Sequence, residues 1–355
     1  MYDCFTPGEP WLDTAGKPIQ AHGFSVFYEN GVYYWYGENK EFTRPFSSSY
    51  TWGIRCYAST DLYNWEDKGL IIQPEPDDPQ SPLNPIYCID RPHILRSPAT
   101  GNYVAWIKVM AGLTSQFMCI LQADSFLGPY RFVHRYYHPL GMDAGDFALY
   151  QEEATGKAYI LFDRPHFELV TAELTPDYTG VTGAYSAHYQ NCKPPYTREA
   201  PAAFRRGGSY YLFTSGTTGY YPNPTLTTRF SDFHGEYTAL GSPHQNDATH
   251  TSFNSQISGV LRVEGKNDLY IALADRWLPR RKWSAQQRWM EHRYAWQFRN
   301  YAPDRSPRQT TSLTGKKQRC AVNTSRSRYV WLPIEWQGDT PLLRWQARWR
   351  LQDYQ

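Results

Sequence analysis

The chain has 355 residues and a formal net charge of +2, and aromatic residues make up 17% of it while charged residues make up only 20%. This length allows one large β domain or two ordinary domains, and no apolar run approaches the length of a membrane span. The six cysteines are dispersed and form no CxxC pair, which argues against a structural zinc site and predicts reduced, buried thiols. We therefore expect no bound metal, no cofactor and no membrane association.

Five segments along the chain share one plan, a glycine-containing turn followed by a tyrosine-rich or apolar strand. The spacings between their equivalent tyrosines are 70, 56, 51 and 60 residues. Several short strands per unit at such a period are typical of β-propeller blades, because a single blade cannot bury both of its faces without neighbours. We therefore expect an all-β, five-bladed propeller. The five segments are centred on Tyr33, Tyr103, Tyr159, Tyr210 and Tyr270.

The residues between these units predict further strand pairs. Three stretches, which begin at Cys56, Cys119 and Arg229, each have the pattern strand, turn, strand. Helical periodicity is scarce in the chain. The best candidate helix covers residues 283–301, where the apolar positions follow a helical face only loosely.

Residues 196–223, YTREAPAAFRRGGSYYLFTSGTTGYYPN, begin with a carboxylate at the mouth of a predicted strand pair. Burial disfavours the charged form of such a group, so Glu199 needs a reason to be there. One reason is proton donation in catalysis. The alternative is a carboxylate that simply forms an ion pair with Arg198 or Arg205. The segment taken alone is compatible with both.

A set of short motifs follows the predicted blades in order. They are PWLDTAGKPIQAHG (10–23), YYWYGENK (33–40), CIDRPHIL (88–95), GDFALY (145–150), REAPAAF (198–204), TSGTTGYYPN (214–223), SFNSQ (252–256), DRWLP (275–279) and SRYVWLPIEW (327–336). These motifs resemble those of glycoside hydrolase family 43, and most closely its branch of exo-acting galactan 1,3-β-galactosidases. The resemblance spans nearly the whole chain. It implies one five-bladed propeller over residues 1–355, with an active-site pocket on the propeller axis.

The resemblance also implies roles for two carboxyl groups. Glu199 is expected to be the general acid that protonates the leaving oxygen, and its apolar Ala-Pro surroundings would raise its pKa as that role requires. Asp146 matches the aspartate that orients the acid and modulates its pKa. The alternative for Asp146 is a turn or N-cap carboxylate, and Asp143 lies only three residues away.

Two groups are candidates for activating the attacking water. Ordinary family members have an aspartate at the start of the first blade, where this chain reads IQAHGF. The galactanase branch uses a glutamine, matched here by Gln256, although an amide is a poor base at neutral pH. Asp90 matches a position that is usually glutamate, and it is a candidate base or a ligand to sugar hydroxyls. Its alternative is a salt bridge to Arg91, and Glu38 is a further pocket carboxylate.

Aromatic side chains near the ends of inner strands are candidates to stack on the apolar face of a pyranose ring. Each of them is also a candidate core residue. Gln20 and His22 are candidate substrate-binding residues. His22 and His250 are candidates to line the propeller axis, and a structural histidine is the alternative for each. The stacking candidates are Trp35, Tyr36, Tyr220, Tyr221 and Trp277.

A basic insertion at about 280–327 departs from the family pattern, in which DRWLP runs into SRYVWLP after a few residues. Residues 280–328 contain thirteen Lys or Arg against Glu291 and Asp304, so this piece carries +11 and the remainder −9. High charge and irregular apolar spacing favour disorder or marginal structure over a lid or a surface helix. The charges match no recognisable reader motif, so we expect no nucleic-acid partner.

These features predict an inverting, exo-acting glycoside hydrolase that acts on β-1,3-linked galactosyl residues of galactan or arabinogalactan side chains. The alternatives are an α-L-arabinofuranosidase or β-xylosidase on the same fold, or a noncatalytic carbohydrate-binding propeller. We expect a monomer whose partner is an oligo- or polysaccharide. The N-terminal stretch lacks the basic start and apolar core of a secretory signal, so a cytoplasmic location is expected for the chain as written, although the family is often secreted.

Overall fold

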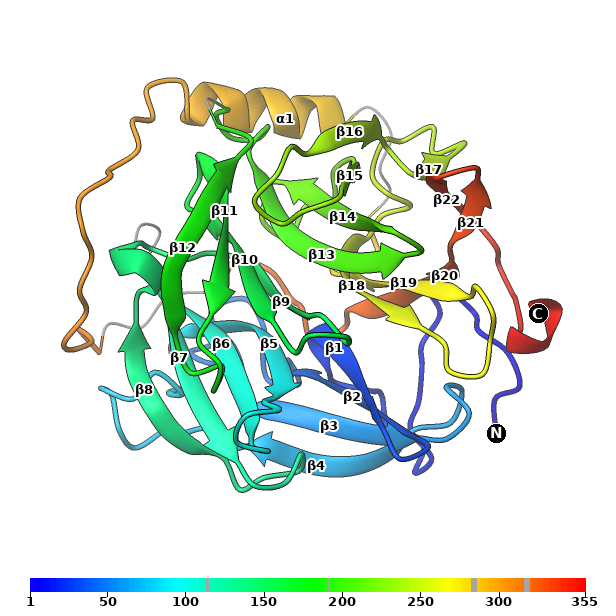
Figure 1. Ribbon diagram of the computed structural model, residues 1–355, viewed down its shortest axis with the longest axis horizontal. Helices are drawn as coiled ribbons and strands as arrows, with labels where there is room; N and C mark the ends of the chain where they lie inside the picture. Colours follow the sequence, from blue (N-terminus) through cyan, green and yellow to red (C-terminus); the bar gives the residue numbers. More distant parts are fainter. Residues whose placement is uncertain (113–114, 191, 282–285, 316–319) are drawn as a thin grey trace.

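The computed structural model describes residues 1–112, 115–190, 192–281, 286–315 and 320–355. In these residues the strands form six sheets of three or four strands each. The sheets are arranged around a common centre, as Figure 1 shows. The all-β propeller fold predicted from the sequence is therefore confirmed.

Four of the sheets are built from consecutive antiparallel strands. The first contains β1 (His22–Glu29), β2 (Val32–Glu38), β3 (Ile54–Ser59) and β4 (Glu66–Ile72). The second contains β5 (Cys88–Arg96), β6 (Tyr103–Gly112), β7 (Ser115–Ala123) and β8 (Arg131–Tyr137). The third contains β9 (Phe147–Gln151), β10 (Ala158–Arg164), β11 (Glu168–Leu174) and β12 (Val181–His188). The fourth contains β13 (Arg198–Arg206), β14 (Ser209–Gly216), β15 (Leu226–Phe230) and β16 (Thr238–Gly241).

The two remaining sheets have three strands each. The fifth contains β18 (Gln256–Arg262), β19 (Tyr270–Arg276) and β20 (Arg328–Pro333). The sixth contains β17 (His244–Gln245), β21 (Glu335–Gln337) and β22 (Thr340–Arg344). The helices are η1 (Pro139–Gly141), α1 (Gln286–Gln297) and η2 (Leu351–Asp353). Among the described residues, no helix combines the length and the apolarity that a membrane crossing would require.

The five tyrosine-centred units are confirmed as strands, because they correspond to β2, β6, β10, β14 and β19, each the second strand of its sheet. The prediction of five blades is wrong, since the described residues form six sheets. The sixth sheet pairs residues 244–245 with residues 335–344. Its strands come from two separate segments without the turn-tyrosine unit, so the repeat could not reveal it.

The first strands of the first five sheets form an inner wall. β1 contacts β5, β5 contacts β9, β9 contacts β13, β13 contacts β18, and β18 contacts β1. Antiparallel pairing places the beginning of each of these strands beside the end of the second strand in the same sheet. Side chains from different sheets therefore meet at one edge of the inner wall.

Apolar side chains are buried on both faces of the sheets. Trp35 and Tyr36 are neighbours on β2 that point to opposite faces, and both are buried. Trp35 packs against Trp331 of β20, with ring centroids 4.7 Å apart. The hydroxyl of Tyr36 accepts a hydrogen bond from the Ile94 N–H of β5 at 2.8 Å. Aromatic residues that alternate along a strand can thus all belong to the core when each sheet is flanked on both sides.

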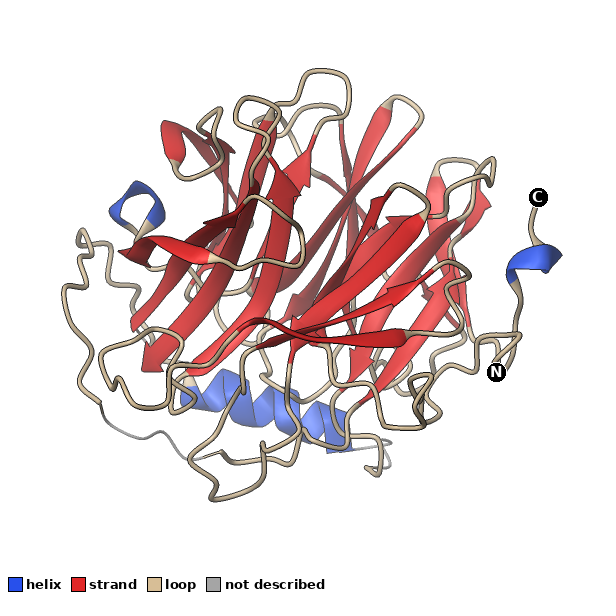
Figure 2. Ribbon diagram, turned by 90° about the horizontal axis from the view of Figure 1, so that it is seen from below, coloured by secondary structure: helices blue, strands red, loops and turns tan. Residues whose placement is uncertain are grey.

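The described part of the insertion contains one helix and contacts the propeller, and the disorder expected for the segment stays a prediction. The helix α1 falls inside the predicted range 283–301, and Figure 2 shows it across the strand ends on one face of the propeller. Further along, the Arg308 N–H donates to the Gly141 carbonyl at 2.8 Å, and the Leu313 N–H donates to the Gln80 side chain at 2.7 Å. These hydrogen bonds join the insertion to parts of the propeller that are distant in the sequence. Residues 282–285 and 316–319 lie outside the described residues.

Candidate active site

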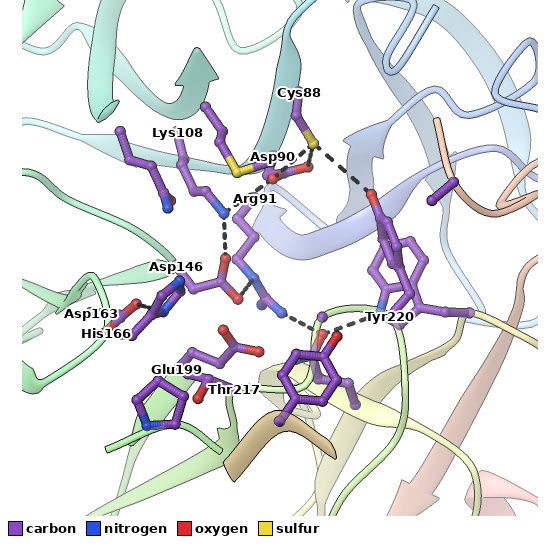
Figure 3. Close-up of a pocket in the computed structure, with 18 of the residues that line it drawn as sticks. Cys88, Asp90, Arg91, Lys108, Asp146, Asp163, His166, Glu199, Thr217 and Tyr220 are labelled. Atoms are coloured by element: carbon purple, nitrogen blue, oxygen red, sulfur yellow. Dashed lines mark hydrogen bonds and ion pairs between the residues drawn. The ribbon is translucent and has the colours of Figure 1, made fainter. Parts of the chain in front are cut away.

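A cavity of about 520 Å³ opens at the edge where the innermost strands begin (Figure 3). Pockets for small molecules typically have volumes of about 300–1,000 Å³. The wall includes the beginnings of β5, β13 and β18 and the ends of β2 and β10. The cavity brings together seven of the predicted site residues: Glu38, Asp90, Asp146, Glu199, Tyr220, Gln256 and Trp277.

Glu199 is the second residue of β13. The strand has a bulge between Glu199 and Ala202, and Ala200 has a φ of 51°. Such irregularities change the direction of a side chain and are common beside active sites. Burial raises the pKa of Glu199 well above its usual range, and the nearby charges of Asp146 and Asp163 raise it further. The raised pKa favours the protonated form of the carboxyl group, which is the form that a proton donor needs.

Neither arginine that could have paired with Glu199 does so. Arg198 donates from Nε to the Thr214 hydroxyl at 2.9 Å, and Arg205 donates from Nε to the Gly207 carbonyl at 3.1 Å. Among the described residues, no ion pair of Glu199 with either guanidinium is present. Lys108 and Arg91 act to lower the pKa of Glu199, but burial and the two acidic neighbours outweigh them.

Asp146, directly before β9, has the opposite electrostatic environment. Its Oδ1 accepts a hydrogen bond from Lys108 Nζ at 2.8 Å, and its Oδ2 lies 2.7 Å from Arg91 Nε. Burial alone would raise the pKa of Asp146, but Arg91 and Lys108 outweigh burial and lower it. The pKa values of Asp146 and Glu199 are thus shifted in opposite directions, which is the arrangement that acid catalysis uses.

Arg91 connects several of the predicted residues. Besides its ion pair with Asp146, it donates from Nη2 to Oε1 of Gln256 at 2.8 Å, and its backbone N–H donates to Oε1 of Glu38 at 2.9 Å. The alternative salt bridge from Asp90 to Arg91 does not form. A bulge after Asp90 and a φ of 49° at Arg91 turn the guanidinium toward the third and fifth sheets instead.

Gln256, at the start of β18, is held by three hydrogen bonds. Its Oε1 accepts from Arg91 and also from Trp277 Nε1 at 3.1 Å. Its Nε2 donates to the Ser215 hydroxyl at 2.9 Å. A carbonyl oxygen has two lone pairs, and here both are engaged. Gln256 is therefore a polar group of fixed orientation whose side-chain oxygen already accepts two hydrogen bonds.

Asp90 lies between two lysines. Its Oδ2 is 3.1 Å from Lys108 Nζ, and its Oδ1 is 3.6 Å from Lys40 Nζ. The Cys88 thiol donates to Oδ1 at 3.2 Å. Burial would raise the pKa of Asp90, but Lys108 and Lys40 outweigh it and hold the pKa well below its usual range. Asp90 stays ionised, which a general base requires, although the same cations reduce its basicity.

Glu38, the last residue of β2, belongs to the same network of charged side chains, because Lys40 contacts both Glu38 and Asp90. Its Oε2 lies 2.7 Å from Lys40 Nζ, and both side chains are almost inaccessible to solvent. Burial raises the pKa of Glu38 to about 8, although Lys40 opposes the shift. Gly23 makes room for the carboxylate, because a Cβ at that position would lie 1.9 Å from Oε1. Glu38 therefore supports the backbone of Arg91 from inside the fold.

Tyr220 and Trp277 form an aromatic corner of the cavity. Their ring centroids are 5.1 Å apart and their planes make an angle of 65°. Burial raises the pKa of Tyr220 well above its usual range, so its hydroxyl is a neutral hydrogen-bond donor. Tyr221 does not line the 520 Å³ cavity. The Arg281 guanidinium lies over the Tyr221 ring, 5.0 Å from its centroid.

Besides Tyr36 and Tyr221, three further predicted binding residues do not reach the cavity, which corrects those assignments. Trp35 is fully buried in the aromatic core. His22 Nδ1 lies 2.9 Å from Asp275 Oδ1, and the imidazole stacks on a tyrosine of β20. Gln20 Nε2 donates to the Ser325 carbonyl at 3.1 Å. The first and fifth sheets pack closely at this point, so side chains at the start of β1 are enclosed between them.

Asp163 and His166 line the cavity and were not predicted. Their signal in the sequence is a repeated tetrapeptide, because DRPH occurs at residues 90–93 and again at residues 163–166. His166 Nδ1 lies 3.2 Å from Asp163 Oδ2. Asp163, His166 and Glu199 each offer a ligand atom within 4.8 Å of the others. This is the set of described residues that could hold a metal ion with mixed nitrogen and oxygen preference.

Lys108 was missed although it joins Asp90 to Asp146. Its signal is a lysine inside the otherwise apolar strand YVAWIKVMAG, since a buried cation requires a buried anion. Five residues of the insertion also line the cavity: Tyr294, Gln297, Phe298, Tyr301 and Ala321. Trp289 and Trp296 of α1, by contrast, are 57% and 67% exposed. Aromatic residues on both faces of α1 explain why its periodicity is weak.

Cleavage of a glycosidic bond needs a proton donor and a second, ionised carboxylate. This propeller cavity contains both kinds of group, which is typical of a glycoside hydrolase. The family model described as glycosyl hydrolases family 43 matches residues 17–277. The chain belongs to glycosyl hydrolase family 43 and is a glycosidase that hydrolyses O-glycosyl bonds. A comparison with curated protein sequences gives no match.

Solved structures of family 43 galactosidases share this fold. A family 43 β-1,3-galactosidase has a TM-score of 0.79 at 26% sequence identity, over 99% of this chain and 65% of that chain. An exo-β-1,3-galactanase from Clostridium thermocellum has a TM-score of 0.74 at 25% identity, over 97% of this chain and 66% of that chain. An exo-β-1,3-galactanase from Phanerochaete chrysosporium with β-1,3-galactotriose has a TM-score of 0.76, over 99% of this chain and 68% of that chain, and its 23% identity indicates the fold alone. This chain thus spans about two thirds of each of these proteins.

Proposed function

We propose that the enzyme is an inverting, exo-acting glycosidase that releases β-1,3-linked galactosyl residues from galactan or arabinogalactan side chains. The observation that carries the proposal is that Glu199 and Asp146 share one cavity, where burial raises the pKa of Glu199 while Arg91 and Lys108 lower the pKa of Asp146. The galactosyl part is supported by the similar structures, which are described as a β-1,3-galactosidase and as exo-β-1,3-galactanases.

In this proposal Glu199 donates its proton to the glycosidic oxygen while the bond from that oxygen to C1 breaks. A water molecule attacks C1 from the opposite face of the sugar, and Asp90 receives the proton that the water loses. Asp90 is favoured over Gln256 because Asp90 is ionised, whereas the Gln256 oxygen already accepts two hydrogen bonds. Asp146 keeps Glu199 protonated between turnovers through its negative charge.

Sugar binding is assigned to the aromatic corner of the cavity. An aromatic ring stacks on the apolar C–H face of a pyranose, and a neutral tyrosine hydroxyl adds a hydrogen bond. Tyr220 and Trp277 offer both kinds of contact. The indole N–H of Trp277 donates a hydrogen bond to Gln256 Oε1, so the orientation of the indole ring is fixed before a sugar binds.

The test is the substitution Glu199→Gln, assayed with galactan oligosaccharides, arabinofuranosides and xylosides. We expect the wild-type enzyme to cleave β-1,3-galactobiose and to release α-galactose first, which proton NMR detects. Removal of a general acid lowers kcat by about 10²- to 10⁴-fold, with binding of galactose largely kept. Glu236→Gln, at an exposed glutamate, is the control and should retain full activity.

Three outcomes would contradict parts of the proposal. Cleavage of arabinofuranosides or xylosides without cleavage of galactosides would contradict the proposed specificity for galactosyl residues. Unchanged hydrolysis by the Glu199→Gln variant would remove Glu199 from its role as the acid. Release of β-galactose as the first product would replace the inverting mechanism with a retaining one.

A further inference from the structure

The insertion contributes a continuous row of aromatic rings to the wall of the cavity. Tyr294 and Phe298 are one helical turn apart, and their rings are nearly parallel, with centroids 6.3 Å apart. The ring of Tyr301 follows at 5.7 Å from that of Phe298, edge to face. All three residues line the cavity. The row therefore presents ring surface to the same space as the charged groups.

This row lies next to Glu199. Tyr294 and Glu199 line the same cavity, and the charge of Glu199 is, after burial, a cause of the raised pKa of Tyr294. The Tyr294 hydroxyl also packs over Gly219, where a Cβ would lie 3.6 Å from it. On the other face of α1, Trp296 is 67% exposed. The helix thus directs Tyr294 inward and Trp296 outward.

The aromatic row is held against the third sheet by polar contacts. The Tyr301 hydroxyl donates to the Pro165 carbonyl at 2.7 Å and accepts from the His166 N–H at 3.2 Å. Further along, Arg308 Nε lies 2.8 Å from Asp143 Oδ2. These contacts are to loops at the ends of fixed strands. The row consequently has a defined position relative to the cavity.

The cavity keeps its volume of about 520 Å³ with the insertion in position. The insertion therefore forms a wall of the site and does not fill it. Because a general acid protonates the oxygen of the leaving group, groups beside Glu199 are on the leaving-group side of the scissile bond. Aromatic rings on that side are suited to stack on the sugar that leaves.

We propose that Tyr294 and Phe298 form the binding platform for the leaving-group sugar, so that the insertion determines which glycosides the enzyme accepts on that side. This inference rests on the proposed function in one respect, the assignment of Glu199 as the acid. The ligand is a pyranose joined through its hydroxyl to the sugar that is released. Tyr301 acts as a positioning residue for this platform through its contacts to residues 165 and 166.

The experiment measures binding to the Glu199→Gln variant by calorimetry, with galactose and with β-1,3-galactobiose. Galactose occupies only the site of the released sugar, whereas the disaccharide also places a sugar beside Glu199. We expect Tyr294→Ala and Phe298→Ala each to weaken disaccharide binding by about fivefold to tenfold and to leave galactose binding unchanged. Trp296→Ala, an aromatic substitution on the outer face of the same helix, should change neither.

An equal loss of affinity for galactose and for the disaccharide, or no loss for either, would overturn the proposal. Tyr294→Leu is a second variant that keeps apolar bulk without a ring face, and it should weaken disaccharide binding as Tyr294→Ala does. Circular dichroism confirms that each variant is folded. If the wild-type enzyme prefers arabinosides or xylosides, the corresponding monosaccharide and disaccharide are used, so that failure of the galactosyl assignment is distinguished from failure of the platform. Binding of none of these sugars would overturn both.

Discussion

The Arg91 guanidinium and the Gln256 side-chain oxygen are joined by a hydrogen bond of 2.8 Å that links the second sheet to the fifth. The same guanidinium forms an ion pair with Asp146 before β9 of the third sheet. One buried cation therefore fixes the relative positions of groups from three sheets. An arginine suits this task because its planar guanidinium presents several donors in a rigid arrangement.

We expect Arg91→Lys to lower kcat by about 10²-fold, because a single ammonium group cannot reach both partners and a displacement of about 1 Å can cost this much. The measurement is steady-state kinetics on β-1,3-galactobiose, with circular dichroism to establish folding. Arg96→Lys, at an exposed ion pair with Glu29, is the matched control and should behave as wild type. Wild-type kcat in Arg91→Lys would show that Arg91 does not organise the site.

The pH dependence of activity follows from the raised pKa of Glu199. Catalysis needs the protonated acid, so activity is present below this pKa and is lost as pH rises through it. Asp146 helps to raise the pKa through its charge. Asp146→Asn removes that charge, so the basic limb of the kcat/KM profile should move to lower pH. Asp143→Asn is the control, because Asp143 pairs with Arg308 and not with the acid, and its profile should not move.

The Lys40–Glu38 pair predicts a stability effect. The Lys40 ammonium is buried 2.7 Å from Glu38 Oε2 and 3.6 Å from Oδ1 of the ionised Asp90, and removal of the cation from such a buried cluster leaves uncompensated negative charge that costs about 3–5 kcal/mol. Lys40→Met should therefore lower the free energy of unfolding by this amount in urea denaturation. Lys68→Met breaks a pair of the same length, 2.7 Å, at a half-exposed site, and such surface pairs contribute less than about 1 kcal/mol. Equal effects of the two substitutions would contradict the prediction.

A substitution at His22 tests whether this residue has a structural role or binds sugar. Its imidazole bonds to the buried Asp275 and does not line the cavity. His22→Phe keeps a stacking ring but leaves Asp275 without this partner, which should lower the free energy of unfolding by about 1–3 kcal/mol. KM for β-1,3-galactobiose should be unchanged. A severalfold rise in KM without loss of stability would assign His22 to sugar binding after all.

Local patterns in the sequence were sufficient to predict the second strand of each of five sheets. A glycine turn and an aromatic strand lie within a few residues of each other, so units such as NGVYYWYGE can be recognised without knowledge of the fold. The roles of neighbouring aromatic residues could not be predicted in this way. Trp35 and Tyr36 point to opposite faces of β2, and only the packing of sheets on both sides shows that neither is free to bind a sugar.

The carboxyl groups of the site could be predicted as members of motifs, but their partners could not. Asp90 and Arg91 are adjacent in sequence, yet a bulge and a positive φ separate their side chains. Arg91 pairs with Asp146, which is 55 residues further along the chain. Such pairings depend on backbone irregularities that composition and periodicity do not encode. The aromatic row of the insertion was missed for a related reason, because the position of these rings depends on contacts with loops that are distant in the sequence.

The insertion has a consequence for how such enzymes diversify. It separates β19 from its antiparallel neighbour β20, so residues 277–327 form the connection between two strands of one sheet. The entropy cost of closing a loop grows only with the logarithm of its length, and a tenfold longer connection costs only about 2 kcal/mol more. A strand connection at this edge can therefore lengthen with little penalty to the propeller. New selectivity can evolve there while the acid and its charged neighbours stay unchanged.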